Sequence, residues 1–286
     1  MDEAFCLYAL TRADCRLEKV GTGVDPRFPV ESVRYGRLAA LTSRVGLDVF
    51  DLTRLEAGTA DMAWLGRVAT RHNEIIAAVA SRTAVLPMRL GIFFDSRESM
   101  IARLSPCEAN AAEFLDRLED RQEWAAKIYV DKAAALRGQP SRNEAGKSNG
   151  QGAGYLAARG LELERRRQLD VRVEQAISTV EARLARFVDA CQRLRPLSRA
   201  FTNRPDEMVW NGAVLLRPSG LGAFRGECEQ LGRELAGSCL SVETTGPWPP
   251  YHFCPDSLTP ETSGRTSHVG TPVGHIPQLR NRASVA

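Results

Sequence analysis

An amphipathic helix followed at once by a short buried strand constrains the fold of this chain more than any other feature. Between residues 61 and 82, apolar side chains recur every three or four residues, the spacing of one helix face packed on a sheet. That face carries Leu65, Val68, His72, Ile75, Ile76 and Val79. The apolar run at residues 85–91 ends in a glycine and predicts a buried strand, and Pro87 marks it as an edge or bulged strand.

Two polar residues in this stretch need partners. His72 lies on the apolar face of the predicted helix, where a histidine is more often a bonded core residue than a catalytic base. Arg89 lies in the predicted strand and must reach its end or find a partner. We expect Arg89 or nearby strand carbonyls to bond His72, which would hold the helix against the strand.

Composition limits the class of protein. The chain has 286 residues, 43% of them hydrophobic, enough for two domains with their own cores. Its 38 basic and 35 acidic residues leave a net charge of +3, so we expect no nucleic-acid or membrane partner. Seven scattered cysteines indicate free thiols in a reducing compartment, and we place the protein in the cytoplasm.

The order of predicted elements is α+β. Strands are expected at residues 5–10, 30–35 and 37–43, with a tight turn at Gly36, and helices at 95–104 and 108–118. In a further strand Trp124, Ala126, Ile128 and Val130 alternate with Ala125, Lys127, Tyr129 and Asp131. These elements form a predicted first domain at residues 1–137.

Composition changes after this domain. Residues 138–153 are polar and Gly-rich, which indicates a flexible linker. A long amphipathic helix is predicted from Tyr155 to about Leu194, followed by strands at 197–201 and 208–217 and a helix at 222–235. We predict a second α+β domain at residues 154–255 and a disordered tail at 256–286.

The sequence contains no complete catalytic or metal-binding motif. Gly146-Lys147-Ser148 has neither the first glycine nor the preceding strand of a phosphate-binding loop. Cysteines at 228, 239 and 254 and His252 lack the close ligand pairs of a zinc site. We therefore expect no cofactor, no metal and no enzymatic activity.

Several segments together, in this order and spacing, resemble the gas vesicle protein GvpF/GvpL family up to about Phe253. They are Phe5-Cys6-Leu7-Tyr8-Ala9-Leu10, the helix around His72, Val85-Leu86-Pro87-Met88-Arg89-Leu90-Gly91, Glu123-Trp124-Ala125-Ala126-Lys127, Gly154-Tyr155-Leu156 and Gly246-Pro247-Trp248-Pro249-Pro250-Tyr251. Leu90 stands where the family pattern has Phe, and Ala126 where Val is commoner.

The resemblance implies a ferredoxin-like N-terminal domain and a related α+β C-terminal domain with a long helix. It also implies a minor protein of the gas vesicle, needed for shell assembly, whose partners are the small hydrophobic shell protein GvpA and other gas vesicle accessory proteins. The expected partner-binding residues are His72, Pro87, Arg89, Trp124, Lys127, Tyr155, Trp248 and Tyr251. The competing class is a small-molecule-binding or sensory protein with tandem ferredoxin-like domains, in which His72 and Arg89 would meet an anionic ligand.

Overall fold

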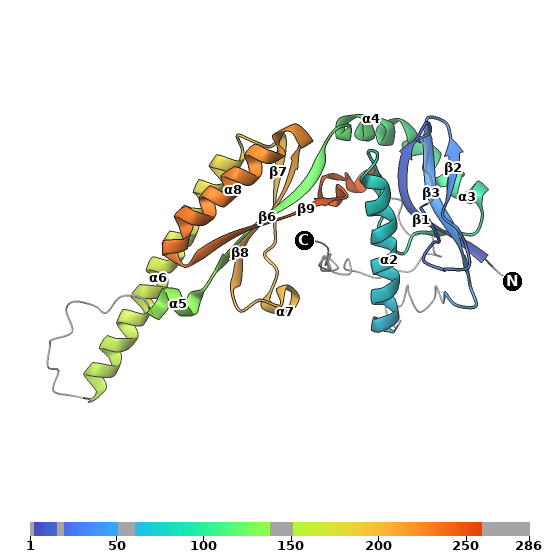
Figure 1. Ribbon diagram of the computed structural model, residues 1–286. Helices are drawn as coiled ribbons and strands as arrows, with labels where there is room; N and C mark the ends of the chain where they lie inside the picture. The colour runs from blue at the N-terminus through green and yellow to red at the C-terminus, as the bar shows by residue number, and fades with distance from the viewer. Residues whose placement is uncertain (1–2, 16–19, 51–60, 138–150, 259–286) are drawn as a thin grey trace, which may run out of the picture. The chain divides into compact units, whose positions relative to one another are not determined.

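The computed structural model describes residues 3–15, 20–50, 61–137 and 151–258, and the chain packs into two compact units. The first unit consists of Met1–Glu123 together with Pro247–Ala286, and the second of Trp124–Gly246. The second unit is thus inserted between two stretches of the first. Each unit has its own antiparallel sheet with helices packed on it, so the fold is α+β, as predicted (Figure 1).

The sheet of the first unit has the order β2-β3-β1-β4, and β5 also pairs with β1. Its strands are β1 (Glu3–Arg12), β2 (Glu31–Tyr35), β3 (Leu38–Gly46), β4 (Leu86–Pro87) and β5 (Phe93–Phe94). The strand predicted at 5–10 is β1, which lies between β3 and β4. Gly36 has a φ of 50° and makes the predicted turn between β2 and β3.

Helix α2 (Met62–Ala80) is the predicted amphipathic helix. Asp61 caps its start by accepting hydrogen bonds from the backbone N–H groups of Ala63 and Trp64. Its buried face includes Ile75, Ile76 and Val79, which share one core with Cys6, Tyr8 and Leu41 of the sheet. The other helices of this unit are α3 (Arg97–Leu104), the short 3-10 helix η1 (Ser105–Cys107) and α4 (Glu108–Leu118).

The predicted strand at residues 85–91 is interrupted. The N–H of Met88 donates to the carbonyl of Tyr8 at 2.8 Å, and the N–H of Leu7 donates to the carbonyl of Ile92 at 3.0 Å. Residues 89–91 therefore bulge out opposite two adjacent residues of β1, and Gly91 adopts a φ of 105°. Pro87 lies on the edge strand β4, as expected, but the strand continues as β5 only after the bulge.

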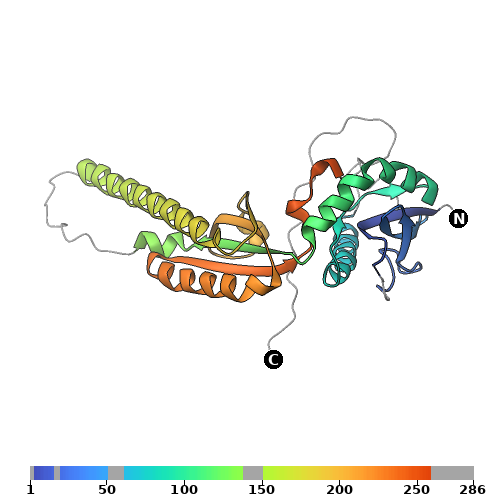
Figure 2. The same ribbon diagram turned by 90° about the horizontal axis from the view of Figure 1, so that it is seen from above.

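The sheet of the second unit has the order β7-β8-β6-β9. Its strands are β6 (Gln122–Val130), β7 (Ala190–Leu194), β8 (Glu207–Leu216) and β9 (Leu240–Trp248). Helices α6 (Gln151–Leu184) and α8 (Leu221–Leu235) lie side by side on one face of this sheet (Figure 2). The core between them contains Ala126, Ile128 and Val130 of β6, which confirms the predicted alternation.

The remaining elements are short. They are α5 (Lys132–Arg137), α7 (Arg199–Thr202) and the 3-10 helices η2 (Pro218–Gly220), η3 (Ala236–Ser238), η4 (Tyr251–Phe253) and η5 (Asp256–Leu258).

The long helix ends earlier than predicted. Helix α6 stops at Leu184, and Cys191 and Leu194, which continue its apolar spacing, lie on β7. Residues 190–194 pair with β8, and the hydrogen bonds of that ladder override the three-four apolar spacing. The strand predicted at 197–201 is also wrong, because residues 199–202 form α7.

The units divide the chain differently from the predicted domains. The predicted first domain, 1–137, includes β6 and α5, whereas β6 is hydrogen-bonded between β8 and β9 in the second sheet. Helix α6 begins at Gln151, inside the predicted 138–153 linker, and the predicted 154–255 domain ends beyond the second unit. Of the predicted tail at 256–286, residues 256–258 form η5. Residues 138–150 and 259–286 lie outside the described residues.

Gly246 and Trp124 contact each other where the chain leaves and enters the second unit. Gly246 has a φ of 147°, and a Cβ at this position would lie 2.8 Å from Cδ2 of Trp124. The Trp124 ring is buried, and the guanidinium of Arg225 lies 5.1 Å from its centre. Both the backbone conformation and the space therefore require a glycine.

We expect Gly246→Ala to lower the free energy of unfolding of the second unit by about 1–3 kcal/mol, because the new methyl group strains the backbone and displaces Trp124. Urea unfolding followed by tryptophan fluorescence measures the change. Gly226→Ala is the matched control, since Gly226 lies within α8 with open space around it and alanine is the better helix former there. Equal stability of the two variants would contradict this account.

Candidate functional site

Residues from distant parts of the chain meet where its C-terminal portion packs on the first unit. We call residues 247–258 the closing segment. It carries Tyr251, His252 and Cys254, which interact with groups on α2, at the start of β6 and on the bulge after β4. All of these groups belong to the first unit.

Glu123 is the central polar group of this cluster. Its carboxylate is 2% exposed and accepts two hydrogen bonds from one residue of the closing segment. The backbone N–H of His252 donates to Oε2 at 3.0 Å, and Nδ1 of the same residue lies 2.6 Å from Oε1. Burial raises the pKa of Glu123, and the contacts with His252 oppose that rise. A carboxylate at this depth needs such a partner, so Glu123 holds His252 in place.

Tyr251 fastens the same segment to α2. Its hydroxyl donates to Oδ1 of Asn73 at 3.0 Å, and its ring packs against the core of the first unit. Burial raises the pKa of Tyr251 above its ordinary range, so the hydroxyl remains a donor at neutral pH. Pro249 and Pro250 before it are buried, and their restricted backbone reduces the freedom that docking removes.

Cys254 lies half-buried near Arg89. Burial raises the pKa of the Cys254 thiol, and the positive charge of Arg89 acts in the opposite direction. The thiol donates to the carbonyl of Pro250 at 3.0 Å. It is therefore protonated at neutral pH and unsuited to act as a nucleophile.

His72 is a core residue. Its side chain is 3% exposed, and its ring centre lies 5.2 Å from that of Tyr8. Burial lowers the pKa of His72 to about 4, while a hydrogen bond with the backbone of Leu7 raises it slightly. The predicted partner of His72 was Arg89 or a carbonyl of the strand that carries it. The observed partner is the backbone of Leu7, on β1. The imidazole is neutral at physiological pH and cannot supply a positive charge for a ligand.

The other predicted partner-binding residues differ in exposure. Pro87 and Trp124 are buried, Lys127 and Trp248 are half-buried, and Arg89 is exposed. The side chain of Tyr155 lies outside the described residues. Trp248 and Tyr251 lie on the closing segment and Arg89 lies near it, while Trp124 and Lys127 belong to the second unit.

Four residues of the cluster were missed as site residues from the sequence: Asn73, Glu123, His252 and Cys254. Two signals were available. Glu123 is a carboxylate at the start of a largely apolar strand, and His252 follows a proline-rich aromatic run. A charged residue at a buried strand position requires a partner, but only the tertiary structure shows which one.

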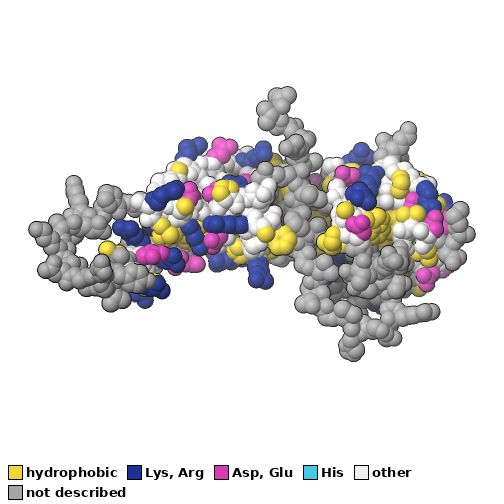
Figure 3. Space-filling view, turned by 90° about the horizontal axis from the view of Figure 1, so that it is seen from below, with side chains coloured by type: hydrophobic (Ala, Val, Ile, Leu, Met, Phe, Trp, Pro, Cys, Tyr) yellow, Lys and Arg dark blue, Asp and Glu magenta, His cyan; other side chains and the backbone are white. Residues whose placement is uncertain are grey.

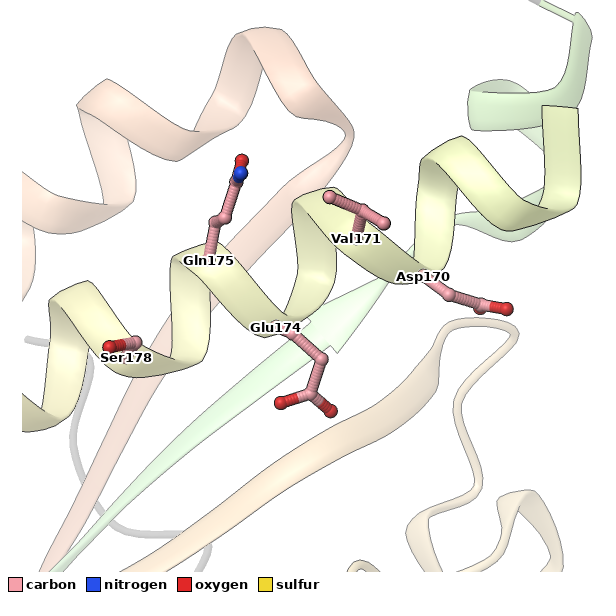
Figure 4. Close-up of a pocket in the computed structure, with 5 residues that line it drawn as sticks. All are labelled: Asp170, Val171, Glu174, Gln175 and Ser178. Carbon is pink, nitrogen blue, oxygen red and sulfur yellow. The ribbon is translucent and has the colours of Figure 1, made fainter. Parts of the chain in front are cut away.

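The cluster fits a structural role better than a chemical one. Its polar atoms bond one another across chain segments, and the described part of the chain contains no group of three or more His, Cys, Asp or Glu side chains able to hold a metal ion. Among the described helices, none is both long and apolar enough to cross a bilayer. A shallow groove on α6 is lined by none of these residues (Figure 4).

The fold and this cluster define the class of protein. It is an α+β protein with two antiparallel sheets, in which residues of the sequence motifs hold separate chain segments together. The family described as gas vesicle synthesis protein GvpL/GvpF matches residues 4–255. The chain belongs to this family, which gives it an accessory role in the gas vesicle.

Individual proteins agree with this assignment. The chain is 29% identical over 252 residues to gas vesicle protein L of Streptomyces sp. (strain CB03234), covering 86% of this chain and 91% of the relative. It is 27% identical over 238 residues to gas vesicle protein F of the same strain, covering 82% and 92%.

Two solved structures share the fold. The crystal structure of the gas vesicle protein GvpF from Anabaena sp. PCC7120 matches with a TM-score of 0.65 at 19% identity, covering 88% of this chain and 98% of that one. GvpF from Microcystis aeruginosa matches with a TM-score of 0.61 at 17% identity, covering 88% and 99%.

We expect Glu123→Ala to release the closing segment, because the N–H and imidazole of His252 lose their acceptor inside the protein. The cost is about 1–3 kcal/mol for a buried donor left unbonded. Hydrogen exchange at residues 251–254 should accelerate, and limited proteolysis should cut there first. Glu119→Ala changes an exposed carboxylate of the same unit and should leave both measurements unchanged. Full protection of residues 251–254 in Glu123→Ala would contradict the role of this pair.

His72 should make stability depend on pH. The pKa is about 4 in the folded chain and 6.5 ordinarily, so between these values the unfolded chain binds a proton that the folded chain does not. The free energy of unfolding should therefore fall as the pH drops from about 6.5 to about 4, by up to about 3 kcal/mol from this residue. Urea unfolding at several pH values measures it, and His72→Gln should lose this part of the dependence. An identical pH dependence in the variant would exclude His72 as its source.

Proposed function

We propose that this protein acts in gas vesicle assembly by binding the small hydrophobic shell protein GvpA and limiting its aggregation during nucleation. It does so as a binding protein, without catalysis. Membership of the GvpL/GvpF family and the names of the related proteins support the setting. A subunit that assembles through an apolar face aggregates when that face is open, so a protein that covers it would keep the subunit soluble.

The observation that carries this proposal is an exposed apolar group on the first unit. We call it the apolar end: Leu47 and Val49, just after β3, and Met62, at the start of α2. Val49 is 52% exposed and Met62 77%. The two chain segments lie together, because the rings of Phe50 and Trp64 pack edge to face at 5.3 Å. Figure 3 shows hydrophobic side chains on one face of this unit, among charges of both signs.

The residues expected to bind the partner divide by exposure. Arg89 is exposed on the bulge at the sheet edge and can contact GvpA directly, and the half-buried Lys127, Trp248 and Tyr251 can do so in part. The buried His72, Pro87 and Trp124 would act by holding these surfaces in shape. We keep Tyr155 in the proposal, although its side chain lies outside the described residues.

The small-molecule alternative has less support. The shallow groove on this chain is lined by five residues of one helix, whereas ligand sites usually join polar groups from several elements. His72, one of the two residues invoked for an anionic ligand, is buried and neutral.

Co-expression with GvpA tests the proposal. The soluble fraction of GvpA and its co-purification should both rise with this protein present, compared with an empty vector. Replacing Val49 and Met62 by Asp should reduce co-purification at least about fivefold, the effect of losing about 1 kcal/mol of binding free energy.

Phe201→Asp is the matched control, because Phe201 is 58% exposed and lies in the second unit. It should leave GvpA binding unchanged. Unbound, insoluble GvpA in the presence of the wild-type protein would overturn the proposed function. Equal loss in both variants would remove the apolar end as the contact.

A further inference from the structure

The turn that follows β3 exposes two apolar side chains and is fixed on both sides of them. The N–H groups of Val49 and Phe50 both donate to the carbonyl of Gly46, at 3.1 and 3.0 Å. Phe50, at the end of the turn, is 3% exposed and belongs to the core of the first unit. Between these fixed points, Leu47 is 39% exposed and Val49 52%.

Arg27 joins the middle of this turn to a buried carboxylate. Its Nη1 and Nη2 donate to the two carboxylate oxygens of Asp48, both at 2.9 Å. Its Nε and Nη2 also donate to the carboxylate of Asp25, at 3.0 and 2.7 Å. The bonds from Arg27 hold the pKa of both carboxylates below its ordinary range, so the bridge is charged at neutral pH. Only the planar fork of an arginine can bond two acids in this way.

The buried end of the bridge is itself fixed. The side chain of Asp25 is 2% exposed, and its carboxylate also accepts a hydrogen bond from the N–H of Gly46 at 3.1 Å. The loop that carries Asp25 is held to β1, because the hydroxyl of Tyr8 accepts a hydrogen bond from the N–H of Val24 at 2.9 Å. Since a buried carboxylate needs partners, Asp25 keeps Arg27 in one orientation.

A fixed turn favours binding through conformational entropy. An apolar side chain on a mobile loop must be ordered when a partner covers it, and this ordering subtracts from the free energy of binding. On a turn that is already held, most of that cost is absent. The side chains of Arg27 and Asp48 are 40% and 50% exposed, and an ion pair at such exposure adds little to folding stability. The pair is therefore placed to order the turn rather than to hold the fold together.

We propose that Arg27 is a positioning residue for GvpA binding. By bridging Asp25 and Asp48, it holds the apolar side chains of the turn in the arrangement that GvpA contacts. This inference rests on the proposed function, because Leu47 and Val49 belong to the apolar end. It adds a residue that acts on affinity through the order of the turn, without itself contacting GvpA.

Two single variants and their combination test the proposal in co-expression with GvpA. Arg27→Lys keeps the positive charge and can still bond Asp25, but it cannot bond both acids bidentately. Asp48→Ala removes the other end of the bridge. Each should lower the molar ratio of co-purified GvpA about threefold to fivefold, the scale of an exposed ion pair of good geometry. The double variant should lose no more than either single variant, because all three lack the same bridge.

Two further measurements separate positioning from general stability. Hydrogen exchange at the amides of Val49 and Phe50 should be several times faster in each variant, even without GvpA, because both amides lie in the turn. The urea midpoint of Asp48→Ala should stay at the wild-type value. Glu113→Ala is the matched control, since it removes an exposed ion pair with Arg117 on α4 and should change neither GvpA binding nor this exchange.

The outcomes distinguish this inference from the proposed function. A wild-type protein that does not bind GvpA would overturn both. If the wild-type protein binds GvpA and both single variants bind it equally well, only the role of Arg27 is overturned. Losses that add in the double variant, or that parallel a lower urea midpoint, would also overturn that role, because they assign the effect to separate causes or to general unfolding.

Discussion

The bond between Glu123 and His252 is the contact on which the organisation of the molecule depends. The first unit is made of two stretches of chain separated by the whole of the second unit. Glu123 is the last residue of the first stretch, and His252 lies near the start of the second. Because a buried carboxylate is unfavourable without a partner, this pair makes correct docking of the closing segment a condition of stable folding.

Several residues in or near the segments that carry the family resemblance serve this joining. Tyr251 bonds Asn73 beside the buried His72, Cys254 bonds the carbonyl of Pro250, and Gly246 leaves room for Trp124. Within this cluster, burial raises the pKa of the Tyr251 hydroxyl and of the Cys254 thiol, so both stay protonated at neutral pH. The exposed apolar side chains Leu47, Val49 and Met62 of the first unit take no part in these contacts.

Local sequence patterns predicted most helices and strands, but not how these elements pair and pack in the tertiary structure. The apolar face of α2, the turn at Gly36 and the alternation in β6 follow from periodicities that a single element sets. The end of α6 at Leu184 could not be predicted from such a periodicity, because the apolar residues Cys191 and Leu194 are also compatible with a strand that pairs with β8. Pro87 signalled an edge or bulged strand, but the position of the bulge at Arg89 and the partner of His252 depend on residues far away in the sequence.

The nesting of one unit inside the other also sets the order in which the protein can be completed. All of Trp124–Gly246 leaves the ribosome before His252 does, so the second sheet can form while the first unit still lacks its last piece. Strands β6 and β9, which lead into and out of the insertion, are hydrogen-bonded neighbours. Once β6 and β9 pair, they bring the closing segment back toward Glu123. The closing segment then has only a short distance to search before it docks and completes the first unit.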